Sequence, residues 1–500
     1  MISKQKKICY FLVSVVLLSF GRASVLWPLA PITAICGYAL AWKSLSSRPF
    51  LSAWLLFSLT NLISHSWLLS HPFSYIILVW LLVSLLFALP YALISKHIVT
   101  TDLNFSRIIQ YAALLTLTEW LFTVLPCGFS FQTAALHLSW HAIPLQTASL
   151  VGASGLAFLV FLTNLFIYAN SWIAIIFALI PYAIGTGLFW HHVEEQKKAS
   201  HIKLAICHMN EEPDVWMSHL SPPDLHTQEW NKVLSLLSPL ENQKVDLIVL
   251  PEGVVPFPAY AQLYDARLLP SAFSVQADFA LSSLDIAHII AHKFDTSIIL
   301  GLESGGYPSH NSCYFVNRDK IERYDKQLLL PLGEYIPFEL LSSWLASYGI
   351  HSSFSPGNEA KILDADNLAL SPLICYEETF ATYTEKASKL APKALVSLSN
   401  DNWFPNSGLA KLHLEVARLR AVEIGRPLIR SCNKGASAAI DALGQTVAQK
   451  EGDAGVVICS LAQYSHPTLY QHIGATGFAY LFLSFSLISC FPKRKIESIE

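Results

Sequence analysis

The chain has 500 residues, of which 53% are hydrophobic and only 14% are charged, whereas a soluble protein has roughly 25% charged residues. Its formal net charge of −3 gives no sign of the basic surface that nucleic-acid binding needs. The nine cysteines show neither a Cys-x-x-Cys pair nor metal-like spacing, so we expect no disulfide framework and no metal site.

Charged residues are distributed very unevenly along the chain. Residues 8–190 contain seven Asp, Glu, Lys and Arg residues, whereas residues 191–470 contain 54. The contrast predicts a membrane-type half and a globular half that is long enough to bury a full core. We therefore expect an N-terminal membrane domain over 1–195, a globular domain over 196–470, and a C-terminal span with a basic tail over 471–500.

The membrane-type half contains apolar stretches of the length needed to cross the hydrocarbon core of a bilayer. We place seven of them near 8–21, 24–42, 50–68, 74–95, 108–125, 147–168 and 172–190, and one more near 472–491. The pattern predicts a multi-pass α-helical membrane domain with about eight spans.

The basic residues predict the orientation of these spans, because cytoplasmic loops are enriched in Lys and Arg. They lie before the first span and after the second, fourth and last spans, whereas the 69–73 and 126–146 connections contain none. Both termini are then cytoplasmic, and the globular domain lies on the opposite side of the membrane. A cleavable signal peptide over residues 1–24 is the competing interpretation, but six further spans make its removal unnecessary.

Glu119 lies inside a predicted span, where an ionisable group is costly. We favour a structural interpretation, in which the carboxyl group is hydrogen-bonded between helices. A functional role for Glu119 is the alternative.

From residue 202 onward, short apolar runs alternate with longer amphipathic ones. Strands are predicted at 202–207, 245–250, 297–301, 368–374, 394–398 and 456–459, with hairpins over 311–326 and 438–447. Helices are predicted at 225–240, 277–294, 377–390 and 409–424. Strands that are apolar throughout indicate sheets covered on both faces, so we expect an α/β layered sandwich.

Three chemically active side chains lie at the ends of predicted strands: Glu252, Lys326 and Cys375. A thiol at a strand-to-helix turn lies next to backbone N–H groups, which suits a nucleophile. Because a free thiol is mostly protonated at neutral pH, Glu252 can accept its proton, while Lys326 favours the thiolate and then the oxyanion. The backbone N–H of Tyr376 is a second oxyanion donor. From these residues alone, an inert buried cysteine is the competing interpretation.

Five motifs occur in order along the globular half. They are Pro-Glu-Gly at 251–253, the segment from Tyr-Asp-Lys to Ile-Pro-Phe-Glu at 324–339, Ile-Cys-Tyr-Glu at 374–377, Ser-Asn-Asp-Asn-Trp-Phe at 399–404, and the segment from Arg-Ala-Val-Glu to Leu-Ile-Arg-Ser at 420–431. Together they resemble the carbon–nitrogen hydrolase (nitrilase-like) superfamily and, with the spans, the apolipoprotein N-acyltransferase family. Short segments of the membrane half at 118–120, 125–129 and 151–155 are similar to that family as well.

The resemblance implies a nitrilase-like αββα sandwich with a catalytic triad of Glu252, Lys326 and Cys375. It also implies supporting or substrate-binding residues at Glu334, Tyr376, Glu377, Trp216, Asn311 and Trp403. Two of these have structural alternatives, because Asn311 can pair within its hairpin and Trp403 can belong to the core.

For function, the resemblance implies transfer of a fatty acyl chain through a thioester on Cys375, the last step of lipoprotein maturation. The donor is a phospholipid, by resemblance phosphatidylethanolamine, and the acceptor is the α-amino group of the N-terminal S-diacylglyceryl-cysteine of an apolipoprotein. The enzyme then works among the lipids of a bacterial inner membrane, with its catalytic domain in the periplasm, and it needs no cofactor. Two rival functions are a membrane-bound amidase that hydrolyses small amides and an inactive scaffold for lipid binding or transport.

Overall fold

The computed structural model describes residues 3–125, 127–211, 223–273, 280–347, 351–365 and 368–487, except the side chains of 223–226. The chain divides into two compact units. Unit 1 comprises Met1–Leu69, Phe73–Leu188 and His472–Glu500, and unit 2 comprises Ser70–Pro72 and Phe189–Gln471.

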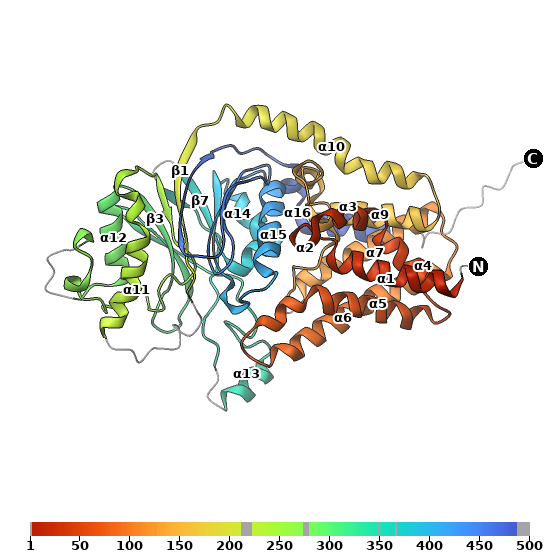
Figure 1. Cartoon of the computed structure of the whole chain (residues 1–500), viewed down its shortest axis with the longest axis horizontal. Coiled ribbons are helices and arrows are strands. Elements are labelled where there is room, and N and C mark those ends of the chain that lie inside the picture. Colours follow the sequence, from red (N-terminus) through yellow and green to blue (C-terminus); the bar gives the residue numbers. More distant parts are fainter. Residues whose placement is uncertain are drawn as a thin grey trace, which may run out of the picture. The chain divides into compact units, whose positions relative to one another are not determined.

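Helices occupy each of the stretches that the sequence predicts to be apolar spans (Figure 1). Their bounds are α1 Lys4–Phe20, α2 Ala23–Leu26, α3 Ala30–Ile32, α4 Tyr38–Ser44, α5 Pro49–Ser64, α6 Ile76–Thr100, α7 Phe105–Val124, α8 Ala142–Leu145, α9 Ala148–Tyr168, α10 Ile173–Gln196 and α16 Leu469–Leu487. Short 3₁₀ or π segments lie between them, namely η1 Trp27–Leu29, η2 Thr33–Gly37, η3 Ser66–Ser70 and η4 Ala134–His137. The helical character of the membrane-type half is therefore confirmed.

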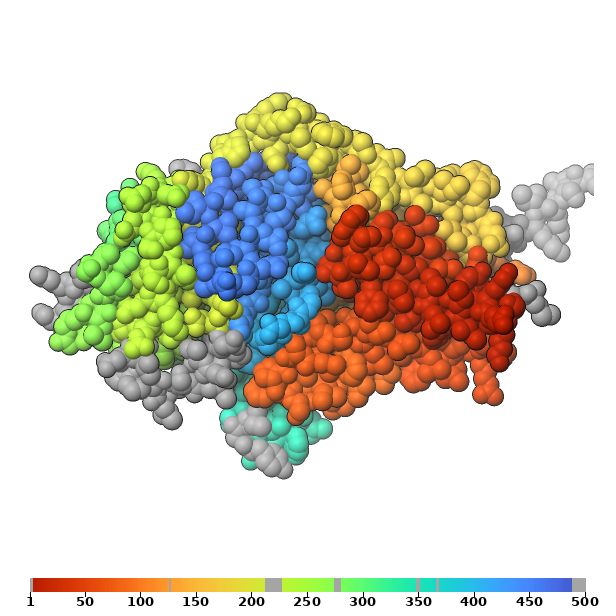
Figure 2. Space-filling model, viewed as in Figure 1, coloured from red at the N-terminus to blue at the C-terminus, as the bar shows by residue number. Residues whose placement is uncertain are grey.

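Among the residues that the structure describes, four helical stretches are long and apolar enough to cross a membrane: Ala23–Ser44, Ile76–Thr100, Ala148–Tyr168 and Ile173–Gln196. α1, α5 and α6 pack side by side, and Figure 2 shows their outward surface in red and orange. Large apolar side chains of α6 such as Leu78 and Leu86 are exposed there, as expected of a lipid-facing helix. The chain is a membrane protein, and the count of eight spans stays a prediction.

Glu119, on α7, is a buried carboxylate whose oxygens accept three hydrogen bonds. Tyr91 of α6 donates at 3.0 Å, the Thr133 hydroxyl at 2.9 Å and the backbone N–H of Ala134 at 2.9 Å. These donors offset the cost of placing a carboxylate among apolar helices. The hydrogen bonding expected for the Glu119 carboxyl group is confirmed, and its structural role stays a prediction.

Unit 2 contains two six-stranded sheets. The first has the order β12-β1-β2-β3-β4-β5, with bounds Gly455–Ala462, His201–His208, Leu247–Val249, Ser297–Glu303, Asn311–Val316 and Ile321–Asp325. The second has the order β11-β10-β9-β8-β7-β6, with bounds Thr446–Lys450, Ser437–Ile440, Leu428–Asn433, Ala394–Asn400, Leu368–Ile374 and Leu363–Ala365. β1, β2 and β3 run parallel, as do β7, β8 and β9, and the remaining neighbours pair antiparallel.

The two sheets bury one apolar core between them, to which β2 contributes Val249 and β7 contributes Leu370. Helices cover the opposite faces: α11 Pro223–Leu236 and α12 Ser283–Phe294 on the first sheet, and α14 Ala381–Lys389 and α15 Leu409–Ile424 on the second. Figure 1 shows the layers in the order helix, sheet, sheet, helix. This arrangement explains why the strands are apolar on both faces. The expected αββα sandwich is confirmed.

Three predicted helices differ from the observed ones. The helix expected over 277–294 begins at Ser283, because Ser282 and Asp285 form a capping box, and residues 277–279 lie outside the described residues. The helix expected over 377–390 is divided into the 3₁₀ helix η9 (Cys375–Thr379) and α14. The helix expected over 225–240 ends at Leu236 and is followed by a 3₁₀ segment over Ser238–Asn242.

Candidate active site

Glu252 and Lys326 meet at one edge of the first sheet. β5 runs in the same direction as β2, because two antiparallel steps separate β5 from β3, so both strands end at this edge. Lys326 directly follows β5 and is 1% exposed, and Glu252 follows β2. The Lys326 Nζ donates to Glu252 Oε1 at 3.2 Å.

Glu334 and Asn311 complete a network around this pair. Lys326 Nζ donates to Glu334 Oε1 at 2.9 Å, and Asn311 Nδ2 donates to one oxygen of Glu252 and one of Glu334, each at 2.7 Å. The second Glu334 oxygen accepts from the backbone N–H of Leu330 at 2.6 Å. The backbone of Asn311 pairs within its hairpin, because its carbonyl oxygen accepts from the N–H of Lys326 at 2.9 Å. The pairing expected of Asn311 is therefore confirmed, and its side chain in addition binds the two carboxylates.

Gly301 of β3 allows the loop that carries Glu252 to lie directly against the sheet. Two backbone hydrogen bonds join the loop to Gly301. Gly301 N donates to Pro251 O at 3.1 Å, and Val254 N donates to Gly301 O at 3.0 Å. A Cβ at Gly301 would lie only 2.6 Å from the Cα of Glu252. A side chain at this position would therefore displace the carboxylate.

Cys375 begins the turn η9 after β7, with a positive φ of 50° that a non-glycine residue rarely adopts. The residue is partly buried and packs against the core between the two sheets. Burial raises the pKa of its thiol well above the ordinary value, and the charge of Glu252 adds to this effect. Lys326 acts in the opposite direction. Lys326 therefore favours the thiolate form of Cys375.

The charges of the network also change the pKa values of its own members. Burial lowers the pKa of Lys326, but Glu252, Glu334 and Cys375 outweigh burial, so this pKa lies above its ordinary value. Burial raises the pKa of Glu252, and although Lys326 opposes the change, Glu334 reinforces it. The arrangement thus combines a fixed cation with a carboxylate that is a stronger base than usual.

Glu377, two residues after Cys375, is completely buried and accepts several hydrogen bonds. Tyr324 Oη donates to both carboxylate oxygens at 2.9 and 3.0 Å, and the backbone N–H groups of Gln327 and Ile374 donate at 2.6 and 2.7 Å. Burial raises the pKa of Glu377 to about 7 against the effect of these donors. Glu377 therefore anchors the turn to the end of β5.

Three aromatic residues complete the predicted site. Tyr376 is buried, with its ring centroid 4.8 Å from that of Phe380. Trp403 ends the 3₁₀ helix η10 (Asp401–Trp403), is 38% exposed and stacks on His71 of the same unit at 5.8 Å. The interpretation of Trp403 as a core residue is wrong. Trp216 lies outside the described residues.

Sequence reasoning missed a buried ionic cluster beside the turn of Cys375. Its members are Glu378, Asp401, His413 and Arg430. Arg430 was the signal in the sequence, because this charge directly follows the apolar residues Leu428 and Ile429, and the structure buries it completely. A charge buried in this way needs partners of opposite sign.

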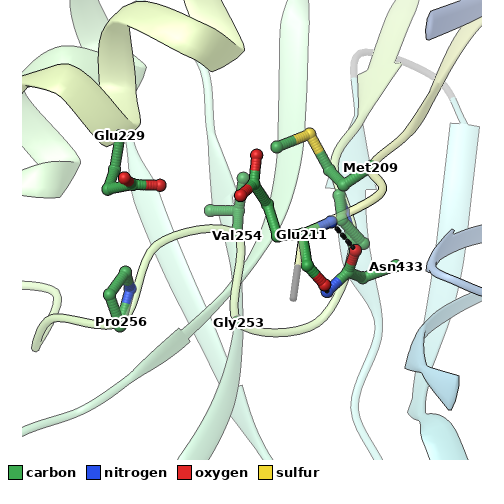
Figure 3. Close-up of a pocket in the computed structure, with 8 residues that line it drawn as sticks. Met209, Glu211, Glu229, Gly253, Val254, Pro256 and Asn433 are labelled. Atoms are coloured by element: carbon green, nitrogen blue, oxygen red, sulfur yellow. Dashed lines mark hydrogen bonds between the residues drawn. The ribbon is translucent and has the colours of Figure 1, made fainter. Parts of the chain in front are cut away.

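The loop of Glu252 also borders a cleft with an empty volume of about 290 Å³ (Figure 3). The cleft is lined by Met209, Glu211, Glu229, Pro251, Gly253, Val254, Pro256 and Asn433. Lys232 Nζ binds both acidic side chains, Glu211 at 3.2 Å and Glu229 at 3.0 Å. The carboxylates of the cleft are thus already paired with a cation.

Residues 203–465, more than half of the chain, match the model of the carbon-nitrogen hydrolase family. The chain belongs to the carbon–nitrogen hydrolase family. Residues 14–166 match a second model, described as the apolipoprotein N-acyltransferase N-terminal domain. The N-terminal half of this carbon–nitrogen hydrolase therefore matches the N-terminal domain of apolipoprotein N-acyltransferases.

Relatives named apolipoprotein N-acyltransferase match most of the chain. The apolipoprotein N-acyltransferase of Chlamydia caviae is 28% identical over 97% of this chain and 97% of its own length. That of Shewanella oneidensis is 27% identical over 78% of this chain and 74% of its own. The resemblance seen in the motifs is confirmed.

Solved structures similar to unit 2 include a carbon–nitrogen hydrolase superfamily protein from Xanthomonas campestris and an amidase from Nesterenkonia. The first is 17% identical, covers 59% of this chain and 98% of its own, and has a TM-score of 0.38. The second is 17% identical, covers 57% and 97%, and also has a TM-score of 0.38. Because these TM-scores are low, the family assignment rests on the sequence matches.

Proposed function

We propose that this membrane protein is an N-acyltransferase that moves a fatty acyl chain from a phospholipid onto an apolipoprotein, the last step of lipoprotein maturation. The observation that carries the proposal is the match, over 97% of the chain, to a protein named apolipoprotein N-acyltransferase. The cluster of Glu252, Lys326 and Cys375 supplies chemistry that suits acyl transfer.

In the first step, the Cys375 sulfur attacks the ester carbonyl carbon of the phospholipid while Glu252 accepts the thiol proton. The ammonium of Lys326 and the backbone N–H of Tyr376 stabilise the negative oxygen of the tetrahedral intermediate. The ester C–O bond then breaks, and the leaving alkoxide takes the proton from Glu252. The products are a thioester on Cys375 and a free lysophospholipid.

In the second step, the α-amino nitrogen of the N-terminal S-diacylglyceryl-cysteine attacks the thioester carbonyl carbon. Glu252 accepts the proton that the amine loses, and the C–S bond breaks as the amide forms. The proton returns to the Cys375 sulfur, and the enzyme is restored. Glu334 and Asn311 hold Glu252 and Lys326 in place through both steps.

The donor that we propose is phosphatidylethanolamine, and the location is a bacterial inner membrane. Both chain termini then face the cytoplasm, and unit 2 lies in the periplasm, in accord with the distribution of Lys and Arg. The bilayer around apolar helices such as α6 places phospholipid next to the enzyme, which supports a lipid donor. Hydrolysis of small soluble amides would make no use of these helices.

The first half of the reaction can be tested by intact-mass measurement of the full chain after incubation with phospholipid. We expect a mass increase equal to one acyl group on the wild-type protein, and its loss on treatment with hydroxylamine. Cys375→Ala should show no increase. Cys459→Ala, which removes another partly buried thiol, should be acylated like the wild type.

An unmodified wild-type protein, or acylation of Cys375→Ala, would contradict the proposal. Release of ammonia from small amides without any acyl transfer would favour the amidase instead.

A further inference from the structure

The turn that carries Cys375 is held by two successive glutamates that bind different parts of unit 2. Glu377 accepts from Tyr324 and Gln327, at the end of β5 beside Lys326. Glu378, also in η9, binds the second sheet: its Oε1 accepts from Arg430 Nε of β9 at 3.0 Å. The turn is therefore fixed from two sides.

The second anchor belongs to a cluster of four buried side chains from four elements. Glu378 and Arg430 are 0% exposed, His413 is 2% exposed and Asp401 is 3% exposed. The two ring nitrogens of His413, on α15, lie 3.2 Å from Glu378 Oε1 and 3.0 Å from Asp401 Oδ1. The ion pairs of Arg430 and the ring nitrogens of His413 thus link η9, η10, α15 and β9.

Arg430 lies at the centre of this cluster. Its Nη2 donates to Ser399 Oγ at 3.0 Å and to Asp401 Oδ2 at 3.3 Å, and its Nη1 donates to the backbone carbonyl of Ala436. With the bond from Nε to Glu378, the guanidinium connects the turn η9 to β8, β9 and η10. Only the planar fork of an arginine can make these contacts at once.

Stability alone does not account for the position of the cluster. Buried ion networks are costly to desolvate, and apolar replacements of similar volume are often as stable. The residue that the cluster holds is a cysteine with a positive φ, a conformation that persists only when the surroundings enforce it. The cluster also joins this turn to Asp401, which begins the helix of Trp403.

The charges around the thiol come from both sheets. Glu252 and Lys326 act on Cys375 from the first sheet, and Asp401 and Arg430 act on it from the second. The thiol is therefore influenced by the charges of Glu252 and Lys326 and by those of the buried cluster. A displacement of the turn would change all of these distances together.

We propose that Glu378 and Arg430 are positioning residues, which hold the turn of Cys375 so that its sulfur faces Glu252 and Lys326. Both side chains are completely buried and bind other groups of the protein. The inference rests on the proposed acyl transfer for its reaction, but the geometry that it describes exists without substrate.

The test compares Glu378→Gln with Glu423→Gln in the full chain. Glu423→Gln breaks a second buried ion pair of α15, between Arg420 Nη1 and Glu423 Oε2 at 2.7 Å, which does not include the turn. We expect Glu378→Gln to lower kcat for acyl loading at least about tenfold with an unchanged KM, because only alignment of the sulfur is lost. Glu423→Gln should lower the thermal midpoint to a similar degree but keep its kcat.

Arg430→Lys provides a second variant, because lysine keeps the positive charge but cannot form the fork. It should lose kcat like Glu378→Gln. An Arg430→Lys enzyme with wild-type kcat would mean that charge alone matters and would contradict positioning.

Alkylation of Cys375 by iodoacetamide gives a readout that does not depend on acyl transfer. The modified peptide is followed by mass across a range of pH. In Glu378→Gln the pH midpoint of Cys375 alkylation should fall by about half a unit or more. Arg430 loses one of its two counter-charges in this variant, so its positive charge favours the thiolate more strongly. A folded Glu378→Gln protein with the wild-type kcat and alkylation profile would overturn the inference. If the wild type loads no acyl chain, the proposed function fails, and the alkylation profiles alone decide this inference.

Discussion

Lys326 is the residue on which the charge balance of the site depends. Its buried ammonium faces the carboxylates of Glu252 and Glu334 and the thiol of Cys375. The Lys326 ammonium therefore binds the carboxylates of Glu252 and Glu334 in the resting site and also stabilises the Cys375 thiolate when it forms. The cost of burying it is offset only because these partners are present.

Replacing Lys326 with methionine should raise the pKa of the Cys375 thiol. Lys326 lowers this pKa in the native protein, so its removal leaves burial and the negative charge of Glu252 unopposed. The midpoint of Cys375 alkylation should move to higher pH by about one unit or more. Lys320→Met, which removes a lysine on the exposed side of the same hairpin, should leave the midpoint unchanged. A midpoint that stays or falls in Lys326→Met would show that the ammonium does not act on the thiol.

Glu377 makes the stability of unit 2 depend on pH. Its pKa is about 7 in the folded protein against an ordinary value of 4.5, so the folded state binds its proton more tightly than the unfolded state. The stabilisation is therefore complete below pH 4.5 and is lost as the pH rises through 7.

In Glu377→Gln the stability of unit 2 should not show this loss as the pH rises. Between pH 5 and pH 8 the free energy of unfolding of the wild type should decrease relative to that of Glu377→Gln by about 2.5 kcal/mol, as followed by thermal unfolding of the two proteins. Glu339→Gln, on an exposed helix, should keep the wild-type pH dependence. Parallel curves for the wild type and Glu377→Gln would mean that the carboxyl group remains ionised in the folded protein throughout.

The predicted site residues could be found because short motifs surround them, whereas their partners could not. Glu252, Lys326 and Cys375 each lie at a strand end, where an active side chain is recognisable. Glu378 and Arg430 are separated by 52 positions in the chain, and nothing in either segment indicates that they meet. Their pairing follows from the parallel alignment of β7, β8 and β9, which only the tertiary structure supplies.

At the scale of secondary-structure elements, Gly301 determines how closely β3 and the loop of Glu252 approach. Gly301→Ala would place a Cβ 2.6 Å from the Cα of Glu252, so the loop must move. We expect a loss of stability of about 1–3 kcal/mol and a fall in kcat of at least about tenfold. The measurements are thermal unfolding and the rate of acyl loading.

Gly408→Ala is the matched control, because a Cβ at Gly408 meets nothing within 4 Å. Its rate of acyl loading should equal that of the wild type. Full activity in Gly301→Ala would show that the loop tolerates displacement and that its close approach to β3 is not needed.

The elements that sequence analysis missed lack a clear apolar pattern. β9 (Leu428–Asn433) is completely buried, but Arg430, Ser431 and Asn433 interrupt its apolar pattern, so no strand was predicted. β6 (Leu363–Ala365) has only three residues, and α13 (Glu339–Ala346) has no buried residue, so neither leaves a strong periodic signal. The long apolar strands were predicted because their patterns agree with their burial.

At the scale of the whole molecule, the orientation of the membrane helices gives a direct prediction. Tyr307, in unit 2, is fully exposed, and Ser47 is exposed in the connection that follows the second predicted span. Cysteine at position 307 should react with a membrane-impermeant maleimide in spheroplasts, whereas cysteine at position 47 should react only after the membrane is opened. The labelled peptide is identified by mass. The reverse pattern would place unit 2 in the cytoplasm.

The pairing of β1 with β12 has a consequence for biosynthesis. β1 is the first strand of unit 2 to be made and β12 is the last, yet the two lie side by side over their full lengths. Until the ribosome has released Gly455–Ala462, the hydrogen-bonding groups along one side of β1 have no partner strand. The nascent chain must therefore remain protected from aggregation until β12 has been made and can close the sheet.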